Sequence, residues 1–170
     1  IKKNLYFPIT FLEPENDNLN ALGLDIGFEK NRLEGAIKAQ DTGKAQITGP
    51  INLVQEKLKV PGFLFYAPFY KGGVSSNQKL RQENFEGMVY AAFVVSKLIY
   101  GTLEQERRLL DIKISDQGHV LYDEHTSNND RTPLLKQNIK LDVYGRTWDF
   151  EIRSTKKFEQ AATSNLPITI

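Results

Sequence analysis

The chain carries one cluster of side chains whose chemistry would suit a metal ion. It holds both histidines of the chain and three carboxylates within ten consecutive positions: Asp116, His119, Asp123, Glu124 and His125. Imidazole nitrogen and carboxylate oxygen are common zinc ligands. However, the cluster spans an expected strand and its loop, and its spacing matches no known ligand motif. We interpret it as a polar strand rim and expect neither a metal nor a cofactor.

Other catalytic arrangements are poorly represented. The chain has no cysteine, which removes thiolate metal sites and cysteine nucleophiles. It also lacks the Gly-x-Ser-x-Gly, Gly-x-Gly-x-x-Gly and Walker patterns, so neither a serine hydrolase nor a phosphate loop is indicated. Asp149 and Glu151 form a carboxylate pair on the polar face of an alternating strand, whereas general-base catalysis needs such a group inside a cleft. We expect that this chain is not an enzyme.

A group of aromatic side chains in the first half points instead to a small-molecule pocket. Its members are Phe63, Phe65, Tyr66, Tyr70 and Tyr90. Small-molecule sites are mostly apolar and contain a few polar groups that orient the ligand. Tyr66, Tyr90 and Thr48 could each offer a hydroxyl, and Arg32 is the cation of this half best placed to meet a ligand. The alternatives are that the aromatic side chains only fill the core and that Arg32 is an exposed helix position.

The first half supplies strands and one helix to position these groups. Leu33, Ala36 and Ile37 recur at helical spacing, and Gly43 suits a left-handed cap, so a helix is expected over Glu29–Thr42. A second helix should begin with Ser96 as its cap and run to about Arg108. We expect strands over Tyr6–Leu12, Thr48–Gln55, Gly62–Tyr70 and Phe85–Val95, and a polar loop over Val74–Glu83.

The second half alternates apolar and polar residues. This pattern predicts a sheet with one buried face. The expected strands are Leu110–Ser115, Val120–Tyr122, Asn138–Val143 and Thr147–Arg153, with a tight turn at Gly145-Arg146 between the last two. The chain therefore consists of two αβ halves, joined by the helix after Ser96.

Two strands of the first half are apolar on both faces. These are Gly62–Tyr70 and Met88–Val95, and such strands must be covered on both sides. We find one helix in this half to cover them. The remaining apolar surface requires a further helix, a dimer partner or a bound small molecule.

Composition excludes some classes of function. The chain has 170 residues, 40% of them hydrophobic and 25% charged, with a formal net charge of +1, so it has no bulk attraction for nucleic acid. The longest apolar run, Met88–Val95, has eight residues, where a membrane span needs about 20. The chain opens on Ile1 and shows no signal peptide, which suggests a piece of a longer protein.

An ordered set of motifs resembles the CHASE domain. The matching strings begin at Tyr6-Phe-Pro-Ile-Thr-Phe-Leu-Glu-Pro14, Ala21-Leu-Gly-Leu-Asp25 and Asp41-Thr-Gly43. They continue with Thr48-Gly-Pro50, Leu53-Val-Gln55, Pro68-Phe-Tyr-Lys-Gly-Gly73 and Gly87–Phe93. They cover roughly residues 6 to 122. The resemblance implies an extracytoplasmic sensor attached to histidine kinases, nucleotide cyclases or diguanylate cyclases, in a family that includes the plant cytokinin receptors.

The family fold has an N-terminal stalk helix followed by two PAS-like subdomains. This implies an α+β fold with antiparallel sheets, in which the membrane-distal subdomain holds the ligand. We assign residues 1–95 to that subdomain, 96–160 to the connecting helix and the membrane-proximal subdomain, and 161–170 to a tail. The stalk helix is expected to lie outside this chain.

The resemblance also implies a set of pocket residues. An aspartate that binds the purine-like ring in cytokinin receptors is matched here by Arg32, while a threonine is retained as Thr48. A leucine is matched by Val54 and another threonine by Tyr66. With the apolar residue Ile26 and positions on the two apolar strands, the expected ligand-binding set is Ile26, Arg32, Thr48, Val54, Leu64, Tyr66, Tyr90 and Ala92. A cytokinin is not expected; a carboxylate or phosphate paired with Arg32 would suit the site.

We therefore expect an extracytoplasmic small-molecule sensor domain of a transmembrane histidine kinase or cyclase. It would lie on the periplasmic or extracellular side of the cell membrane, anchored by segments outside this chain. The full receptor is expected to be a homodimer, and no nucleic-acid partner is expected. The alternative is a dimerisation or protein-interaction module of the same receptor that binds no ligand.

Overall fold

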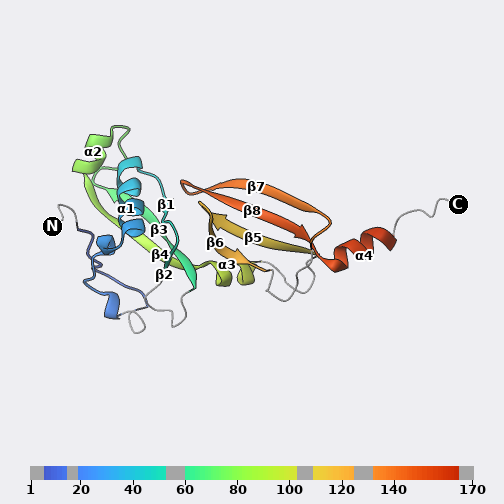
Figure 1. Cartoon of the computed structure of the whole chain (residues 1–170). Helices are drawn as coiled ribbons and strands as arrows, with labels where there is room; N and C mark the ends of the chain where they lie inside the picture. The colour runs from blue at the N-terminus through green and yellow to red at the C-terminus, as the bar shows by residue number, and fades with distance from the viewer. Residues whose placement is uncertain (1–5, 15–18, 53–59, 103–108, 125–131, 165–170) are drawn as a thin grey trace. The chain divides into compact units, whose positions relative to one another are not determined.

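The computed structural model describes residues 6–14, 19–52, 60–102, 109–124 and 132–164 (Figure 1). The chain divides into two compact units. The first unit runs to Val94 and includes the short segment Tyr144–Arg146, and the second consists of Val95–Val143 and the residues from Thr147 onwards. Each unit has a four-stranded antiparallel sheet with helices. The predicted α+β class, with two antiparallel sheets, is confirmed.

The first unit is built around its longest strand. Its elements are η1 (Leu19–Ala21), η2 (Ile26–Phe28), α1 (Lys30–Thr42), β1 (Gln46–Ile47), β2 (Ile51–Asn52), β3 (Pro61–Tyr70), α2 (Gln78–Glu83) and β4 (Phe85–Val94). β4 pairs antiparallel with β3 along nearly its whole length, and β1 and β2 both pair with β3 as well. Of the two strongly apolar strands predicted from the sequence, β3 is thus the central strand of this sheet, and β4 is its longest partner.

Helix α1 forms where the spacing of apolar residues predicted it. Glu29 caps its N-terminus by accepting hydrogen bonds from two backbone amides, and Gly43 ends it with φ of 68° in the left-handed region that glycine tolerates. Ala36 and Ala39 are fully buried on its inner side. At Gly35 an added Cβ would lie 3.1 Å from a ring carbon of Tyr66, so the helix lies close against β3.

Three local predictions for the first unit are wrong. Of the strand expected over Thr48–Gln55, only β2 forms within the described residues, because Gly49-Pro50 makes a corner between β1 and β2. At this corner the Thr48 hydroxyl accepts from the Leu64 amide and donates to the Gly49 carbonyl. The expected strand Tyr6–Leu12 makes only an isolated bridge between Pro8 and Asp25, since proline has no N–H to donate.

The expected loop Val74–Glu83 contains the helix α2. The Asn77 side chain caps it by accepting from the amides of Lys79 and Leu80. Arg81 then ties it to α1 by donating to the carbonyl of Asp41. α2 buries no residue, so it shows no apolar periodicity from which it could be predicted.

The two faces of the β3–β4 pair differ in how far their side chains are buried. Leu64, Tyr66 and Tyr70 are buried on the α1 face, where the Tyr70 hydroxyl donates to carbonyls of α1. On the other face Phe69 is 46% exposed and Val89 is 66% exposed. Part of the apolar surface anticipated from the sequence therefore stays uncovered by the residues that the structure describes.

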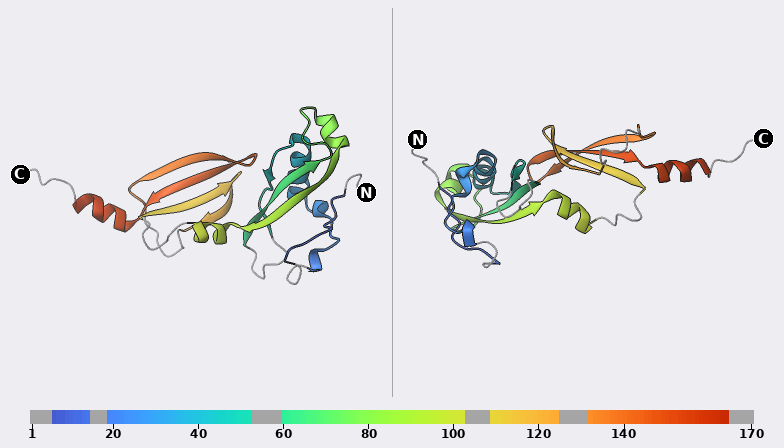
Figure 2. Two further views of the ribbon diagram at one scale, coloured as in Figure 1. Left: turned by 180° about the vertical axis from the view of Figure 1, so that it is seen from behind. Right: turned by 60° about the horizontal axis from the view of Figure 1, so that its bottom comes forward.

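The second unit has the four strands that alternation predicted. Its elements are α3 (Val95–Thr102), β5 (Leu110–Asp116), β6 (His119–Asp123), β7 (Lys136–Val143), β8 (Arg146–Ser154) and α4 (Lys156–Ser164), with the strand order β6-β5-β8-β7. Ile114, Leu121, Tyr122 and Trp148 are buried. Helix α3 lies against β6 (Figure 2), and the rings of Tyr100 and Tyr122 meet edge to face.

Three details of the chain from Val95 onwards differ from expectation. The tight turn is at Tyr144-Gly145, one residue earlier than predicted, and both residues have positive φ, as a type I′ turn requires. Helix α3 begins at Val95, directly after β4, so Ser96 is not its cap; its expected end at Arg108 lies outside the described residues. Helix α4 was not predicted, although Thr155 caps it by accepting from the Phe158 amide.

A candidate ligand pocket in the first unit

A cavity of about 30 Å³ opens on the α1 face of the first sheet. The segment around η1 and η2, the first turn of α1 and strands β3 and β4 enclose it. Its lining consists of Ile9, Ala21, Leu24, Asp25, Ile26, Phe28, Arg32, Leu64, Tyr90 and Ala92. Five of these were expected from the sequence: Ile26, Arg32, Leu64, Tyr90 and Ala92.

The floor of the cavity comes from the pairing of β3 with β4. Leu64 lies opposite Ala92, and Tyr66 lies opposite Tyr90. Directly opposed residues of an antiparallel pair share one face of the sheet, so all four point to the α1 side. The small side chain of Ala92 leaves space beside Leu64.

The wall opposite the floor is the segment that carries η1 and η2. The amide of Ile9 donates to the carbonyl of Leu24, and the amide of Ile26 donates to that of Phe7. The Asp25 carboxylate joins the same two segments, because its Oδ1 accepts from the amides of Phe7 and Gly27, each at 2.9 Å. Hydrogen bonds between two irregular segments therefore hold the wall together.

Arg32 brings a positive charge to the cavity. It lies in the first turn of α1, and 8% of its surface is exposed, which excludes the alternative of an exposed helix position. Its Nη2 donates to the carbonyl of Asn52 at 3.1 Å, and its guanidinium carbon lies 5.1 Å from the ring centre of Phe28. Its Nε is buried and has no hydrogen-bond partner among the residues that the structure describes.

Two tyrosines lie at the floor: Tyr90 lines the cavity, and Tyr66 lies behind the floor. Tyr66 is fully buried, and its hydroxyl finds no hydrogen-bond partner within the described parts of the chain. Burial raises the pKa of Tyr66 far above its usual range, against the opposing effect of the nearby Arg32 charge. Burial likewise raises the pKa of Tyr90, again partly offset by Arg32. Both phenols therefore keep their protons at neutral pH and can donate hydrogen bonds.

Two of the expected pocket residues, Thr48 and Tyr66, are not among the lining residues that the structure describes. Thr48 is buried and uses its hydroxyl on the backbone of Gly49 and Leu64, so it supports β3 from within the fold. Tyr66 lies behind the floor, next to Tyr90. Val54 lies outside the described residues. Whether the expected set binds a ligand stays a prediction.

The wall residues Ile9, Ala21, Leu24, Asp25 and Phe28 were not expected in the pocket. Most of them belong to the strings 6–14 and 21–25 that carry the family resemblance. The joint occurrence of these two strings is the one sequence signal that could have indicated that the segments meet. Local apolar spacing shows no such pairing, because both segments lack a regular period.

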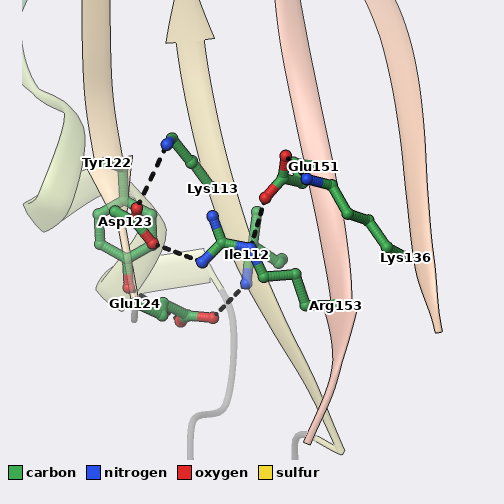
Figure 3. Close-up of polar contacts among 8 residues, drawn as sticks. All are labelled: Ile112, Lys113, Tyr122, Asp123, Glu124, Lys136, Glu151 and Arg153. Carbon is green, nitrogen blue, oxygen red and sulfur yellow. Dashed lines mark hydrogen bonds and ion pairs between the residues drawn. The ribbon is translucent and has the colours of Figure 1, made fainter. Parts of the chain in front are cut away.

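The polar residues of the second unit form a separate network (Figure 3). Arg153, whose side chain is 11% exposed, pairs with Asp123 at 3.1 Å and with Glu151. Lys113 reaches Asp123, and Lys136 reaches Glu151. A hydrogen bond from Lys136 is the main reason that the pKa of Glu151 lies below its usual range. The expected solvated face is in part a chain of ion pairs.

This network also contains two carboxylates of the metal cluster considered above. Asp123 pairs with Arg153 and Lys113, and Glu124 accepts from the Ile112 amide and the Tyr122 hydroxyl (Figure 3). Over the described ranges, no three His, Cys, Asp or Glu side chains gather closely enough to hold a metal; His125 lies outside these ranges. In the same ranges, no helix has the length and apolar character needed to cross a bilayer.

Comparison with known proteins agrees with the resemblance. The family model described as "CHASE domain" matches residues 1–133. The chain is also 24% identical over 196 aligned residues to "Hybrid signal transduction histidine kinase A" of Dictyostelium discoideum. The match covers 97% of this chain and 9% of that protein, so the chain spans under a tenth of the relative's length. CHASE domains are extracytoplasmic sensor domains found in histidine kinase receptors, and they are not themselves catalytic. The chain belongs to the CHASE domain family.

Proposed function

We propose that this domain senses a small molecule in the cavity of its first unit and passes the signal across a membrane to a kinase or cyclase output. The observation that carries the proposal is the buried guanidinium of Arg32 at an otherwise mainly apolar cavity. Its Nε is without a partner among the described residues. Buried charges are normally paired, so a ligand that accepts hydrogen bonds from Arg32 would complete the site.

The size of the cavity gives this sensor a source of conformational change. About 10–15 Å³ holds one water molecule, so a cavity of about 30 Å³ is far smaller than a metabolite. Ligand entry must therefore displace part of the enclosing segments. The irregular wall around η1 and η2 is the part that we expect to move, because fewer backbone hydrogen bonds hold it than hold β3 and β4. A ligand that binds more tightly to the conformation with a displaced wall shifts the population of the domain toward that conformation. The free energy that couples ligand binding to such a change is typically about 1–3 kcal/mol.

The topology of the receptor is part of the proposal. The similar protein from Dictyostelium discoideum is a hybrid histidine kinase of which this chain covers 9%, so the output and the membrane anchor would lie in other segments. We propose that the domain faces the outside of the cell membrane and acts in a homodimer. A topology assay with a reporter fused to each end of this domain in the intact receptor should place both ends outside the cytoplasm.

A thermal-shift screen tests the sensor function. The purified 170-residue chain would be mixed with amino acids, organic acids, nucleobases, amines and sugar phosphates. A ligand at 100 times its Kd stabilises the folded state by about 2.7 kcal/mol, which raises the melting temperature measurably. Ala92→Phe, which fills the cavity, should abolish the shift. Ala91→Phe, on the opposite face of the same strand, is the matched control and should retain it.

The alternative, a dimerisation or protein-interaction module, is favoured by one observation. Phe69 and Val89 are exposed on the face of the sheet that α1 does not cover. On that reading, sedimentation velocity should show concentration-dependent dimers that Val89→Lys disrupts, and no compound should raise the melting temperature. A compound that stabilises the wild type but not Ala92→Phe would reject this alternative.

A further inference from the structure

We infer that the pocket accepts a compact monocarboxylic acid with an apolar body. The inference rests on the proposed sensor function, because it concerns the same cavity. It follows from three properties of the lining that the structure describes: the geometry of the Arg32 guanidinium, the position of a carboxylate, and the apolar character of the remaining surface.

The cation selects an anionic group. Arg32 is the one Lys or Arg residue among the lining residues that the structure describes. Its Nη2 is engaged by the neutral carbonyl of Asn52, while Nε still lacks an acceptor among those residues. The guanidinium presents its donors in a rigid planar fork that matches a carboxylate. A carboxylate would supply both the missing acceptor at Nε and the missing negative charge.

The wall restricts the ligand to a single negative charge. Asp25 also lines the cavity, and its carboxylate already accepts from the amides of Phe7 and Gly27. Glu29, at the start of α1, likewise accepts from backbone amides. Of these two carboxylates, Asp25 lines the cavity, so a second negative charge on the ligand would meet it and find no second cation in the described lining. Like charges in a buried site repel strongly. Dicarboxylates and phosphates are thereby disfavoured.

The rest of the lining restricts the body of the ligand. Apolar side chains from the wall and the floor make up most of the surface: Ile9, Ala21, Leu24, Ile26, Leu64 and Ala92. A hydroxyl or amine placed against them would lose its water without gaining a partner. The carboxylate end would lie at Arg32 and the Tyr90 ring, and the Tyr66 hydroxyl, without a partner among the described residues, is a second donor on that side of the sheet.

Calorimetric titration of the 170-residue chain with matched pairs of compounds tests this inference. The probes are 3-methylbutanoate against 3-methylbutanamide, and benzoate against benzamide. Glutarate and inorganic phosphate are the doubly charged set, and all titrations are run at a pH of about 8, where phosphate is mostly the dianion. A charge-assisted hydrogen bond exceeds a neutral one by roughly 1.4 kcal/mol, so at least one acid should bind about tenfold more tightly than its amide. Glutarate and phosphate should bind more weakly than that acid.

A pair of variants locates the charge that is responsible. Arg32→Gln should weaken binding of the acid about tenfold or more and remove its preference over the amide. Lys30→Gln, which removes an exposed charge from the same helix, should leave the affinity within about twofold, since exposed charges are strongly screened. If Arg32→Gln does not fold, the acid–amide pairs on the wild type decide the matter alone.

The outcomes separate this inference from the proposed function. Equal binding of acid and amide, or tighter binding of glutarate or phosphate, would overturn the monocarboxylate assignment. If a neutral or cationic compound from the thermal-shift screen binds at the cavity and no acid does, the sensor stands and the carboxylate class is wrong. If no compound of any charge binds, the sensor function itself fails.

Discussion

The two units of this domain differ in how their buried arginines are paired. In the second unit Arg153 has two carboxylate partners, and each of these has a further lysine. In the first unit the buried Arg32 has a backbone carbonyl and an aromatic ring as its neighbours. Its Nε and the Tyr66 hydroxyl lack partners among the described residues. Both units have a four-stranded antiparallel sheet, so the difference lies in the side chains.

This difference distinguishes a scaffold from a binding site. A satisfied ion-pair network fixes one arrangement of strands and leaves nothing for a ligand to add. Unpaired donors next to a cavity make the free state less stable than it would otherwise be, and they reserve hydrogen bonds for a ligand. The first unit is therefore where we expect stability to depend on an added small molecule.

The largest expected effect on stability comes from substitutions in the apolar core. Each unit has a core of its own. Leu64 in the first unit and Ile114 in the second are almost fully buried. Replacing either by alanine should lower the free energy of unfolding by about 2–5 kcal/mol, measured by urea denaturation. Trp148, the single tryptophan, lies in the second unit, so its fluorescence reports that unit. If the units unfold separately, Ile114→Ala should lower the urea concentration at the midpoint of the fluorescence transition. Leu64→Ala should lower the midpoint of the circular dichroism transition only.

Exchanging the buried arginine of each unit for methionine should change the stability of the domain by different amounts. Arg153→Met leaves Glu151 and Asp123 without their shared partner and should destabilise the domain by about 1–3 kcal/mol, less than a fully buried pair because the site is partly exposed. Arg32→Met removes a buried charge that has no carboxylate partner in the described structure, and should change stability by less than about 1 kcal/mol in either direction. Equal losses from both exchanges would contradict the contrast between the units.

Tyr66→Phe tests the reserved hydrogen bond. The hydroxyl is buried without a partner among the described residues, so removing it should leave the free domain as stable as before or more stable by up to about 1 kcal/mol. The same change should weaken the binding of the acid ligand. Tyr70→Phe is the control, because the Tyr70 hydroxyl donates to two carbonyls of α1, and its removal should destabilise the free domain by about 1 kcal/mol.

The smallest expected effect is the pH dependence, which differs in direction between the units. The pKa of Glu151 is lowered in the folded state, so its contribution is present above the unfolded pKa of about 4.5 and is lost as pH falls below it. The pKa values of Tyr66 and Tyr90 are raised, so their contribution is present below about pH 10 and is lost as pH rises above it. Thermal melts across pH should show Glu151→Gln flattening the acid limb and Tyr66→Phe flattening the alkaline limb. No change in either limb would reject these assignments.

The sequence predicted those helices and strands whose own residues show a regular pattern. The two-sided apolar runs predicted β3 and β4, and the spacing of Leu33, Ala36 and Ile37 with Gly43 predicted α1 within one residue. These strands and this helix depend on periodicity and turn chemistry, which are local properties. Ile26, Leu64 and Ala92 of the expected ligand-binding set line one cavity, and ligand binding by that set stays a prediction.

The remaining features depend on contacts between distant segments. The wall of the cavity exists because Phe7 and Ile9 pair with residues of the 24–26 segment, and neither segment has a period that shows it. Helix α2 is held by Arg81 on a carbonyl of α1 and not by an apolar stripe. The hydroxyl of Thr48 faces the backbone and not the pocket, because the break at Gly49-Pro50 gives it two backbone partners.

The central claim is that a small molecule binds in the cavity of the first unit, and amide chemical-shift mapping tests it most directly. The 170-residue chain would be titrated with the compound that gives the largest rise in melting temperature. We expect shifts at Ile26, Arg32, Leu64 and Ala92 and along the wall, and little change at Lys113 and Glu151 in the second unit. Shifts confined to the second unit or to the exposed face around Val89, or no compound that shifts any resonance, would contradict it.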